Sequence, residues 1–316
     1  MNSQGMILDD SGLIFPAGKG MVARDGRLDI SLCSLTGASR SWSKRAIKRG
    51  DVRVGNQVVK KPSQVVREGD ELSWPALETP RRASPGHVPF DVLFENDTFA
   101  VIEKPWGVVC HQGAGTRGRT LAEGLIHRFG PLPGEEGRGG LVHRLDRGTH
   151  GLLVIARSEF ALHSLQQAVR KREVKREYVA LVLGDASKIP RILDASLSRH
   201  PKKRVRFTGR FGGRKARTHV DNVIVGEGFS RVMLHLDTGR THQIRVHLSE
   251  AGFPVIGDAL YGGRGARKKW EILHGGPLRW KGHALVAFRL SFADPITSSP
   301  LTFEATLPSL MERFPQ

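Results

Sequence analysis

The residues from His143 to Val154 carry the side-chain types most suited to chemistry. Their sequence, HRLDRGTHGLLV, places one carboxylate, Asp146, between Arg144 and Arg147 and ahead of an apolar run. Neighbouring positive charge lowers the pKa of a carboxyl group and keeps it ionised. The pattern predicts a charged carboxylate at the mouth of a buried strand. The alternative is a structural ion pair, because ion-pair networks also perturb pKa values.

Two later segments carry further groups of this kind. REYVALVLG, residues 176–184, is a strand pattern with Tyr178, whose ring can stack on a base and whose hydroxyl can hydrogen-bond. LDTGRTHQIRVHL, residues 236–248, predicts a turn and then a helix from Thr241, in which Arg245 points away from the apolar stripe. A fixed guanidinium can hold a carboxylate through two hydrogen bonds and keep it ionised.

The charge balance predicts a polyanionic partner. Lys and Arg number 49 and Asp and Glu 31 in 316 residues, which gives a formal net charge of +18. Lys and Arg neutralise phosphates and release counterions, so nucleic acid is the first partner expected and an anionic membrane surface the weaker alternative. No apolar run approaches the roughly 20 residues that span a bilayer, and no secretory signal is expected at the N-terminus.

Metal and redox chemistry are not expected. Cys33 and Cys110 are the only cysteines, and the sequence contains neither CxxC nor HExxH. His242 and His247 are five residues apart, which suits one helical face poorly. Scarce cysteine indicates a reduced, cytoplasmic protein, with a single disulfide as the alternative. We expect no metal site.

The segment at 143–154 resembles the active-site motif of RluA-type pseudouridine synthases, which isomerise uridine in structured RNA. The resemblance implies that Asp146 is the catalytic aspartate and that Tyr178 packs against the target uracil. It further implies that Arg245 forms a salt bridge with Asp146 and that Leu248 lines the uracil pocket.

Three residues around the motif bear on how such an enzyme would work. Arg144 matches an arginine positioned to fill the space left when the target base leaves its stack, with a phosphate contact as the alternative. His150 stands where the family usually has Ser or Thr, and Trp106 where a small residue is usual. These two departures remove no proposed catalytic group, but they bear on pH dependence and substrate choice.

Residues 27–75 resemble an S4 RNA-binding domain. Ser41 is predicted to cap the second helix of this domain, which Gly50 closes. That helix carries basic side chains predicted to contact RNA, namely Arg40, Lys44, Arg45 and Lys48. The alternative is a small α/β domain whose charges only keep it in solution.

The chain divides by composition into four parts. Residues 1–26 are expected to form a loosely packed arm, residues 76–89 a proline-rich linker and residues 90–316 the catalytic domain. The resemblance implies an α+β fold: a mixed, mostly antiparallel sheet flanked by helices, plus the S4-like domain. Within it, Arg199 to Arg217 holds nine Lys or Arg and no acid, with Phe207 and Phe211 interleaved, and predicts an RNA-facing loop or hairpin.

The implied activity is the isomerisation of uridine to pseudouridine without a cofactor, with large-subunit ribosomal RNA as the first expected substrate. Asp146 acts either as a nucleophile or as a base at the ribose. A synthase acting on transfer RNA stays open, as does a non-catalytic RNA-binding ribosome-assembly factor on the same scaffold. A nucleoside glycosidase would usually need a second acid, and no Asp or Glu in the motifs is an obvious candidate. No membrane contact and no protein partner are inferred.

Overall fold

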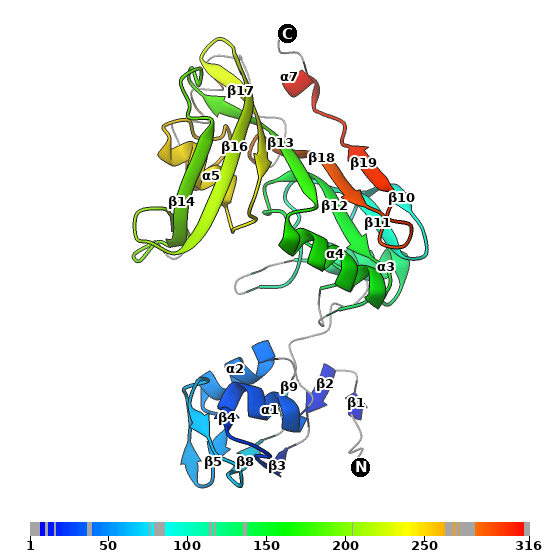
Figure 1. Ribbon diagram of the computed structural model, residues 1–316, viewed down its shortest axis with the longest axis vertical. Coiled ribbons are helices and arrows are strands. Elements are labelled where there is room, and N and C mark those ends of the chain that lie inside the picture. The colour runs from blue at the N-terminus through cyan, green and yellow to red at the C-terminus, as the bar shows by residue number, and fades with distance from the viewer. Residues whose placement is uncertain are drawn as a thin grey trace. The chain divides into compact units, whose positions relative to one another are not determined.

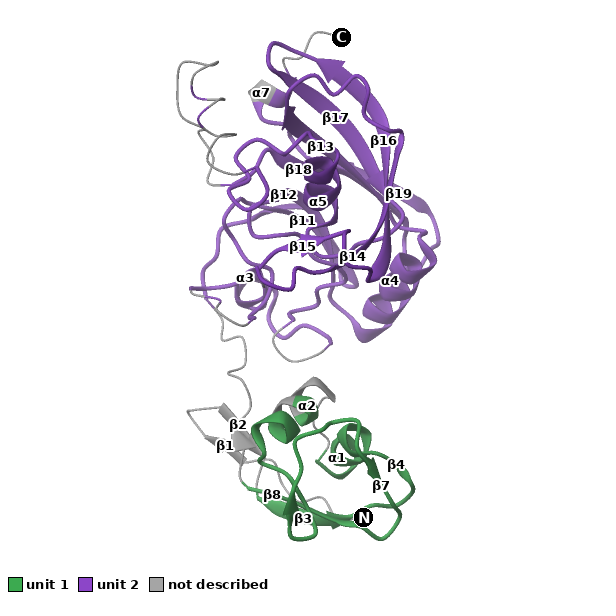
Figure 2. Cartoon of the chain, turned by 90° about the vertical axis from the view of Figure 1, so that its left-hand side faces the viewer, with its two compact units in different colours: residues 1–84, 135–137 green, residues 85–134, 138–316 purple. Residues whose placement is uncertain are grey.

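The structure is a computed structural model of the chain, and it divides into two compact units (Figures 1 and 2). One unit covers residues 1–84, and the other covers residues 85–134 and 138–316. Each unit has its own hydrophobic core. The structure describes residues 7–9, 12–15, 17–36, 40–75, 77–78, 86–113, 116, 118–134, 138–203, 205–262, 268, 271 and 282–312.

Two helices and short strands build the first unit. Leu28, Leu32 and Ile47 are fully buried where the two helices meet the strands. The main sheet has the order β3-β8-β5-β6, β4 pairs with β7, and β1, β2 and β9 form a separate small sheet. The elements are β1 Ile7–Asp9, β2 Gly12–Phe15, β3 Gly18–Met21, β4 Gly26–Arg27, α1 Leu28–Thr36, α2 Arg40–Arg49, β5 Arg53–Val54, β6 Gln57–Val58, β7 Val65–Val66, β8 Glu71–Trp74 and β9 Leu77–Glu78.

Three sequence predictions need correction in this unit. β3 lies inside the predicted arm and pairs with β8. The sequence concealed this strand because Gly18 and Gly20 bring no side chain of their own; a Cβ on either glycine would lie 2.9 Å from the side chains of Trp74 and Leu35, respectively. α2 begins at Arg40, so Ser41 lies inside the helix and cannot cap it. β9 falls within the predicted linker, most of which lies outside the described residues.

The second unit is built on one large sheet. Its strand order is β10-β11-β12-β18-β13-β17-β16-β14-β15, with β19 paired to β18. Among the described strands of this sheet, β12 and β18 pair in parallel and the other ladders are antiparallel, which confirms the predicted fold class. The strands are β10 Asp91–Glu95, β11 Phe99–Lys104, β12 His150–Ala156, β13 Lys175–Leu183, β14 Ile192–Arg199, β15 Phe207–Thr208, β16 Arg214–Val225, β17 Phe229–Leu236, β18 Leu285–Ala293 and β19 Pro300–Glu304.

Helices flank this sheet. α4 lies against β12, and α5 lies against β14 and β16 (Figure 1). The Oγ of Ser158 accepts the N–H of Ala161 and caps the first turn of α4. The helices are α3 Leu121–Phe129, α4 Glu159–Lys171, α5 Gln243–Glu250 and α7 Ser309–Glu312. Within the described part of the chain, no helix is long and apolar enough to cross a membrane.

The centre of the sheet supplies a rigid base for the turn that carries Asp146. Every residue of β11 is buried, as are the residues of β12 from Gly151 onward. At Gly151, where β12 meets β18, φ is +114° and a Cβ would lie 2.3 Å from the carbonyl oxygen of Ala287. A glycine is therefore required at this junction, directly after the turn.

Candidate active site

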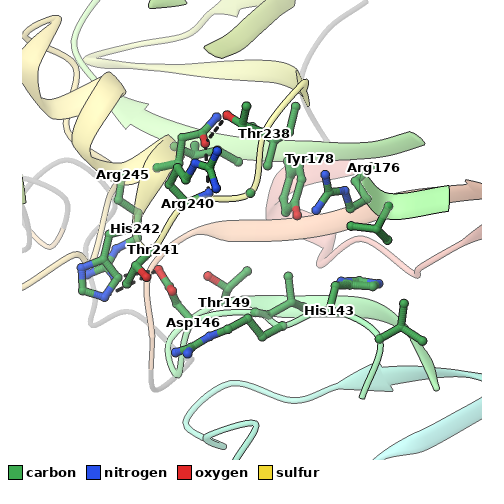
Figure 3. Close-up of a pocket in the computed structure, with 18 of the residues that line it drawn as sticks. His143, Asp146, Thr149, Arg176, Tyr178, Thr238, Arg240, Thr241, His242 and Arg245 are labelled. Atoms are coloured by element: carbon green, nitrogen blue, oxygen red, sulfur yellow. Dashed lines mark hydrogen bonds and ion pairs between the residues drawn. The ribbon is translucent and has the colours of Figure 1, made fainter. Parts of the chain in front are cut away.

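A pocket in the second unit gathers side chains from segments that are far apart in the sequence (Figure 3). The turn before β12 supplies Asp146, β13 supplies Tyr178, and α5 supplies Arg245. The three residues that the sequence predicts as catalytic therefore line one pocket.

The turn that holds Asp146 is fixed from beneath. The N–H of Thr149 donates to the carbonyl oxygen of Asp146 at 3.1 Å, and the N–H of Gly107 donates to that of Arg147 at 2.8 Å. Lys104 is fully buried, and its Nζ donates to carbonyl oxygens of the adjoining loop at 2.8 and 3.0 Å. Burial lowers the pKa of Lys104 to about 8. Lys104 thus supports the turn from inside the protein.

Arg245 holds two carboxylates at once. Its NH1 donates to Oδ2 of Asp146 at 2.9 Å, while its Nε and NH2 donate to Oδ2 and Oδ1 of Asp258 at 2.7 and 2.9 Å. Asp258 is 2% exposed, and its Oδ1 also accepts the backbone N–H groups of Leu260 and Tyr261. The guanidinium is therefore fixed by Asp258 and presents one edge to Asp146.

This arrangement favours the ionised form of Asp146. Burial by itself would raise the pKa of the Asp146 carboxyl, but the neighbouring positive groups and the hydrogen bond from Arg245 outweigh it, so the pKa is lowered. His242 is one of those neighbours, yet burial lowers its own pKa, so near neutral pH Arg245 supplies the charge. Burial likewise opposes ionisation of Asp258, and its bonds to Arg245 lower the pKa of that carboxyl.

His242 is a second neighbour of Asp146 that the sequence analysis did not assign. It adopts the left-handed backbone conformation just before α5, with φ +59°. Its Nε2 lies 4.0 Å from Oδ2 of Asp146, and its Nδ1 lies 2.8 Å from the hydroxyl oxygen of Tyr261. That oxygen already accepts the N–H of Phe207 at 2.8 Å, so its own proton is available to Nδ1. In the tautomer in which Tyr261 donates to Nδ1, the neutral ring would carry its proton on Nε2, which faces Asp146.

The two residues predicted to contact the uracil, Tyr178 and Leu248, differ in their position relative to the pocket. Tyr178 lines the pocket and is 5% exposed, and burial raises the pKa of its hydroxyl. Leu248 is fully buried in the main core and is not among the residues that line the pocket, and its contact with the uracil stays a prediction. It lies about one helical turn after Ile244, which is itself among the apolar residues that line the pocket, namely Leu141, Val142, Leu145, Val169, Leu236, Ile244 and Leu285.

Arg144 lies at the pocket as predicted. Its side chain is exposed, and it lines the pocket two residues before Asp146. The exposed side chain of Arg144 is accessible to RNA, as both predicted roles require. These roles are to fill the space left by the extruded base and to contact a phosphate.

The two departures from the family pattern contact each other. The rings of Trp106 and His150 stack with centroids 4.0 Å apart at 12°. His150 Nε2 lies 2.6 Å from Oε1 of Glu103, and Trp106 Nε1 donates to the carbonyl oxygen of His283 at 3.1 Å. The two departures thus form one packed group, and neither residue lines the pocket.

The basic segment from Arg199 to Arg217 forms a strand hairpin in its described residues. β14 pairs with both β15 and β16. Phe207 is held inside this structure, with the guanidinium carbon of Arg199 5.3 Å from its ring centroid and the His242 ring at 5.6 Å. Phe211 is 60% exposed. Of the two interleaved aromatic residues, Phe211 is therefore the more exposed, with the edge-on ring of His200 at 6.0 Å.

The predicted RNA contacts of the first unit lie on α2, and none of them is among the residues that line the pocket of the second unit. Lys48 is exposed, and Nζ of the partly exposed Lys44 lies 3.8 Å from Oδ2 of the buried Asp29. The side chains of Arg40 and Arg45 lie outside the described part of the structure.

One cluster has the composition of a metal site. The potential ligand atoms of His219, His235 and Asp237 lie within 4.8 Å of one another. However, the two imidazole rings stack face to face, 4.3 Å apart at 3°. A metal ion lies in the plane of each imidazole that binds it, so two parallel rings cannot share one ion in this arrangement.

Asp258 is the most informative residue that the sequence analysis missed. It lies in GDALYGG, residues 257–263, a segment in which the sequence predicts no site residue. The available signal was an acid two residues after the apolar pair Val255 and Ile256, since a carboxylate entering a core needs a cationic partner. Nothing in the sequence named Arg245 as that partner.

The comparisons with known proteins agree with this geometry. The sequence model of the RNA pseudouridylate synthase family matches residues 98–250, and that of the S4 domain matches residues 26–72. Ribosomal large subunit pseudouridine synthase D of Vibrio parahaemolyticus is 38% identical over 296 residues, which cover 90% of this chain and 88% of the relative. The protein of the same name from Escherichia coli O6:H1 is 34% identical over 289 residues, with the same coverage.

Among solved structures, human RNA pseudouridylate synthase domain containing 1 is similar, with a TM-score of 0.54 and 26% sequence identity. The similarity covers 71% of this chain and 86% of the human chain. With both sequence and fold in agreement, the chain belongs to the RluA-type RNA pseudouridine synthases that carry an N-terminal S4 domain.

Proposed function

We propose that this enzyme isomerises specific uridines of large-subunit ribosomal RNA to pseudouridine, with Asp146 as the catalytic residue. The observation that carries the proposal is the carboxylate of Asp146, held ionised by Arg245 in a pocket that Tyr178 also lines. The names of the relatives from Vibrio parahaemolyticus and Escherichia coli support the choice of RNA. We further propose that the enzyme acts in the cytoplasm.

The isomerisation breaks the N1–C1′ bond of uridine, turns the uracil and joins C5 to C1′; C5 loses its proton and N1 gains one, so the formula is unchanged. Asp146 begins this sequence, either by attacking C1′ as a nucleophile or by removing a proton from the ribose as a base. Both routes need the carboxylate of Asp146 to be ionised, and Arg245 keeps it so. Tyr178 packs against the uracil while it turns, and Arg144 enters the space from which the base was extruded.

The net reaction is redox-neutral and adds no group to the uridine, so we propose that it proceeds without a cofactor. We propose that the S4 unit increases the residence of the enzyme on its RNA through Lys44 and Lys48, together with Arg40 and Arg45. An RNA contact spread over two units raises overall affinity without changing the chemistry.

The test is a map of pseudouridine across all cellular RNA in cells with and without this protein. Specific sites in large-subunit ribosomal RNA should vanish without it, return with the wild type and stay absent with Asp146→Asn. Sites in transfer RNA would replace the proposed substrate. If no site changes, or if Asp146→Asn restores the sites, the proposed catalytic function is wrong, and a binding role in ribosome assembly takes its place.

A further inference from the structure

Arg176 is a buried cation that the mechanism above does not use. It lies on β13 two residues before Tyr178, so both side chains project from the same face of the strand. Arg176 is only 8% exposed and lines the pocket. Its side chain makes no hydrogen bond and no ion pair within the described residues, and its Nε is buried without a partner. Figure 3 shows its guanidinium next to Tyr178 and away from Asp146.

The groups around Arg176 do not supply a negative charge. Burial, with a smaller effect of Arg176, lowers the pKa of His143 to about 3, and burial raises the pKa of Tyr178, so both are neutral near pH 7. The two acids that line the pocket have other partners, since Asp146 pairs with Arg245 and Asp237 lies 3.1 Å from His219.

The remaining charged groups of the pocket wall are cationic. They are Arg138, Arg144, Arg170, Arg172, Arg214 and Arg240. An unpaired buried charge is strongly unfavourable. The free protein therefore maintains a guanidinium without its counter-charge in a pocket that is open to a ligand.

We propose that Arg176 binds a backbone phosphate of the RNA substrate close to the target uridine. A phosphate carries its charge before any bond breaks, so it neutralises Arg176 as soon as the RNA binds. The alternative partner is a uracil oxygen, which becomes negative only after the N1–C1′ bond breaks. It would therefore leave the charge of Arg176 uncompensated while the RNA is bound but has not yet reacted. The planar guanidinium matches two oxygens of one phosphate. Gly239 leaves room for it, because a Cβ there would lie 2.9 Å from NH1 of Arg176.

The first experiment measures the stability of the free protein. Arg176→Met keeps the length of the stem and removes the charge. If Arg176 is kept for a ligand, the thermal midpoint of the variant without RNA should equal or exceed that of the wild type. A structural arginine would give the reverse result, and a clear fall in the midpoint would overturn the proposal. Arg245→Met is the matched control, because that buried arginine holds two carboxylates and its loss should lower the midpoint.

The second experiment measures RNA binding in an Asp146→Asn background, so that no turnover occurs. The probe is a synthetic RNA hairpin that contains a uridine identified by the pseudouridine map. Adding Arg176→Met should weaken binding at least about tenfold and reduce the slope of log K against log salt by about 0.7 to 0.9, the loss of one phosphate contact. Arg170→Met, which removes an exposed arginine from the same pocket wall, should weaken binding less. Unchanged affinity on loss of Arg176 would overturn the proposal.

The third experiment locates the phosphate. Neutral methylphosphonates replace the phosphates near the target uridine one at a time. At one position the replacement should weaken binding to the protein that has Arg176 and have no further effect on Arg176→Met. If no position behaves in this way, and the variant instead lowers kcat alone, Arg176 acts on the uracil and the phosphate assignment is wrong.

The inference rests on the proposed function only through the choice of the RNA probe. If the map identifies a transfer RNA, the hairpin is taken from that RNA, and the ribosomal proposal fails while Arg176 is still tested. The stability measurement uses no RNA and remains decisive in either case.

Discussion

Arg245 divides its hydrogen bonds unequally between two carboxylates, and this division sets the properties of Asp146. Two of its donors go to Asp258 and one goes to Asp146. Asp258 fixes the guanidinium and also offsets part of its charge. Asp146 is thereby kept ionised without being neutralised completely, which suits a carboxylate that must still attack or accept a proton.

The role of Asp258 can be tested with Asp258→Asn, which keeps the size of the side chain and removes its charge. Breaking a buried ion pair costs about 3 to 5 kcal/mol, and we expect the lower end because Arg245 keeps Asp146. With its charge no longer shared, Arg245 should lower the pKa of Asp146 further, so kcat should fall and its acid limb should move to lower pH. Urea unfolding and a pH profile of kcat measure the two effects.

Glu304→Gln is the control for that variant. Glu304 is half exposed and pairs with Arg289 at 2.6 Å, so its loss should cost less than about 1 kcal/mol and leave kcat unchanged. Asp258 would be a structural residue only if Asp258→Asn lost stability but kept both kcat and the pH profile of the wild type.

The site residues that can be predicted are those that lie in short local sequence motifs. HRLDRGTHGLLV and GRTHQIR predicted Asp146 and Arg245, whose side chains meet at 2.9 Å across 99 residues of chain. The partnership of Arg245 with Asp258 and the isolation of Arg176 depend on which strands and loops become neighbours. Neither has a local pattern, because an ion pair and an unpaired charge look alike in sequence.

At the scale of elements, strands whose apolar residues alternate can be predicted from the sequence, and strands without that alternation cannot. The alternating Val232, Leu234 and Leu236 of β17 are a pattern that predicts a strand, and the first two of these residues are fully buried. β3 has two glycines and receives its packing atoms from Trp74 and Leu35 instead. A strand that is packed by its neighbours' side chains has no hydrophobic period of its own, so sequence reading assigned it to an arm.

The junction of β12 and β18 gives a second test. Gly151→Ala would place a Cβ 2.3 Å from the carbonyl oxygen of Ala287, on a residue with φ +114°. The strands must separate just after the Asp146 turn, so we expect a loss of about 3 kcal/mol or more and a large fall in kcat. Equilibrium unfolding in urea and single-turnover kinetics measure both.

Gly184→Ala separates backbone strain from steric conflict. Gly184 has φ +86°, but a Cβ there would meet nothing within 4 Å. Its replacement should therefore cost only the strain of the left-handed conformation, about 1 to 2 kcal/mol. Equal losses in the two variants would mean that contact with Ala287 does not matter.

At the scale of the whole molecule, buried neutral histidines make stability depend on pH. Burial, as the largest cause, lowers the pKa of His143 to about 3 and those of His247 and His283 to about 4, against an ordinary value of 6.5. Below pH 6.5 the unfolded chain takes up protons that the folded chain does not. Stability is therefore fully present above that pH and is lost as pH falls, by up to about 1.4 kcal/mol per pH unit for each histidine.

Thermal unfolding between pH 7 and pH 5 checks this dependence. The midpoint should fall throughout this range, and His247→Gln should make the fall shallower. His163→Gln is the control, because His163 is exposed on α4 and should leave the slope unchanged. A midpoint that is constant down to pH 5 would contradict the predicted dependence.

The two units also differ in what they should contribute to function. The core of the second unit, which includes Phe99, Ile102 and Leu153, shares no residue with the core of the first, which includes Leu28 and Leu72. A protein of residues 85–316 should therefore fold and keep its pocket.

Removal of residues 1–84 should then separate affinity from chemistry. If the S4 unit only raises residence on RNA, affinity should fall at least about tenfold, while kcat at saturating RNA stays that of the full chain. A binding curve and single-turnover rates across RNA concentrations measure the two terms. A fall in kcat at saturation, with the thermal midpoint of residues 85–316 preserved, would show instead that the S4 unit helps to place the target uridine against Asp146.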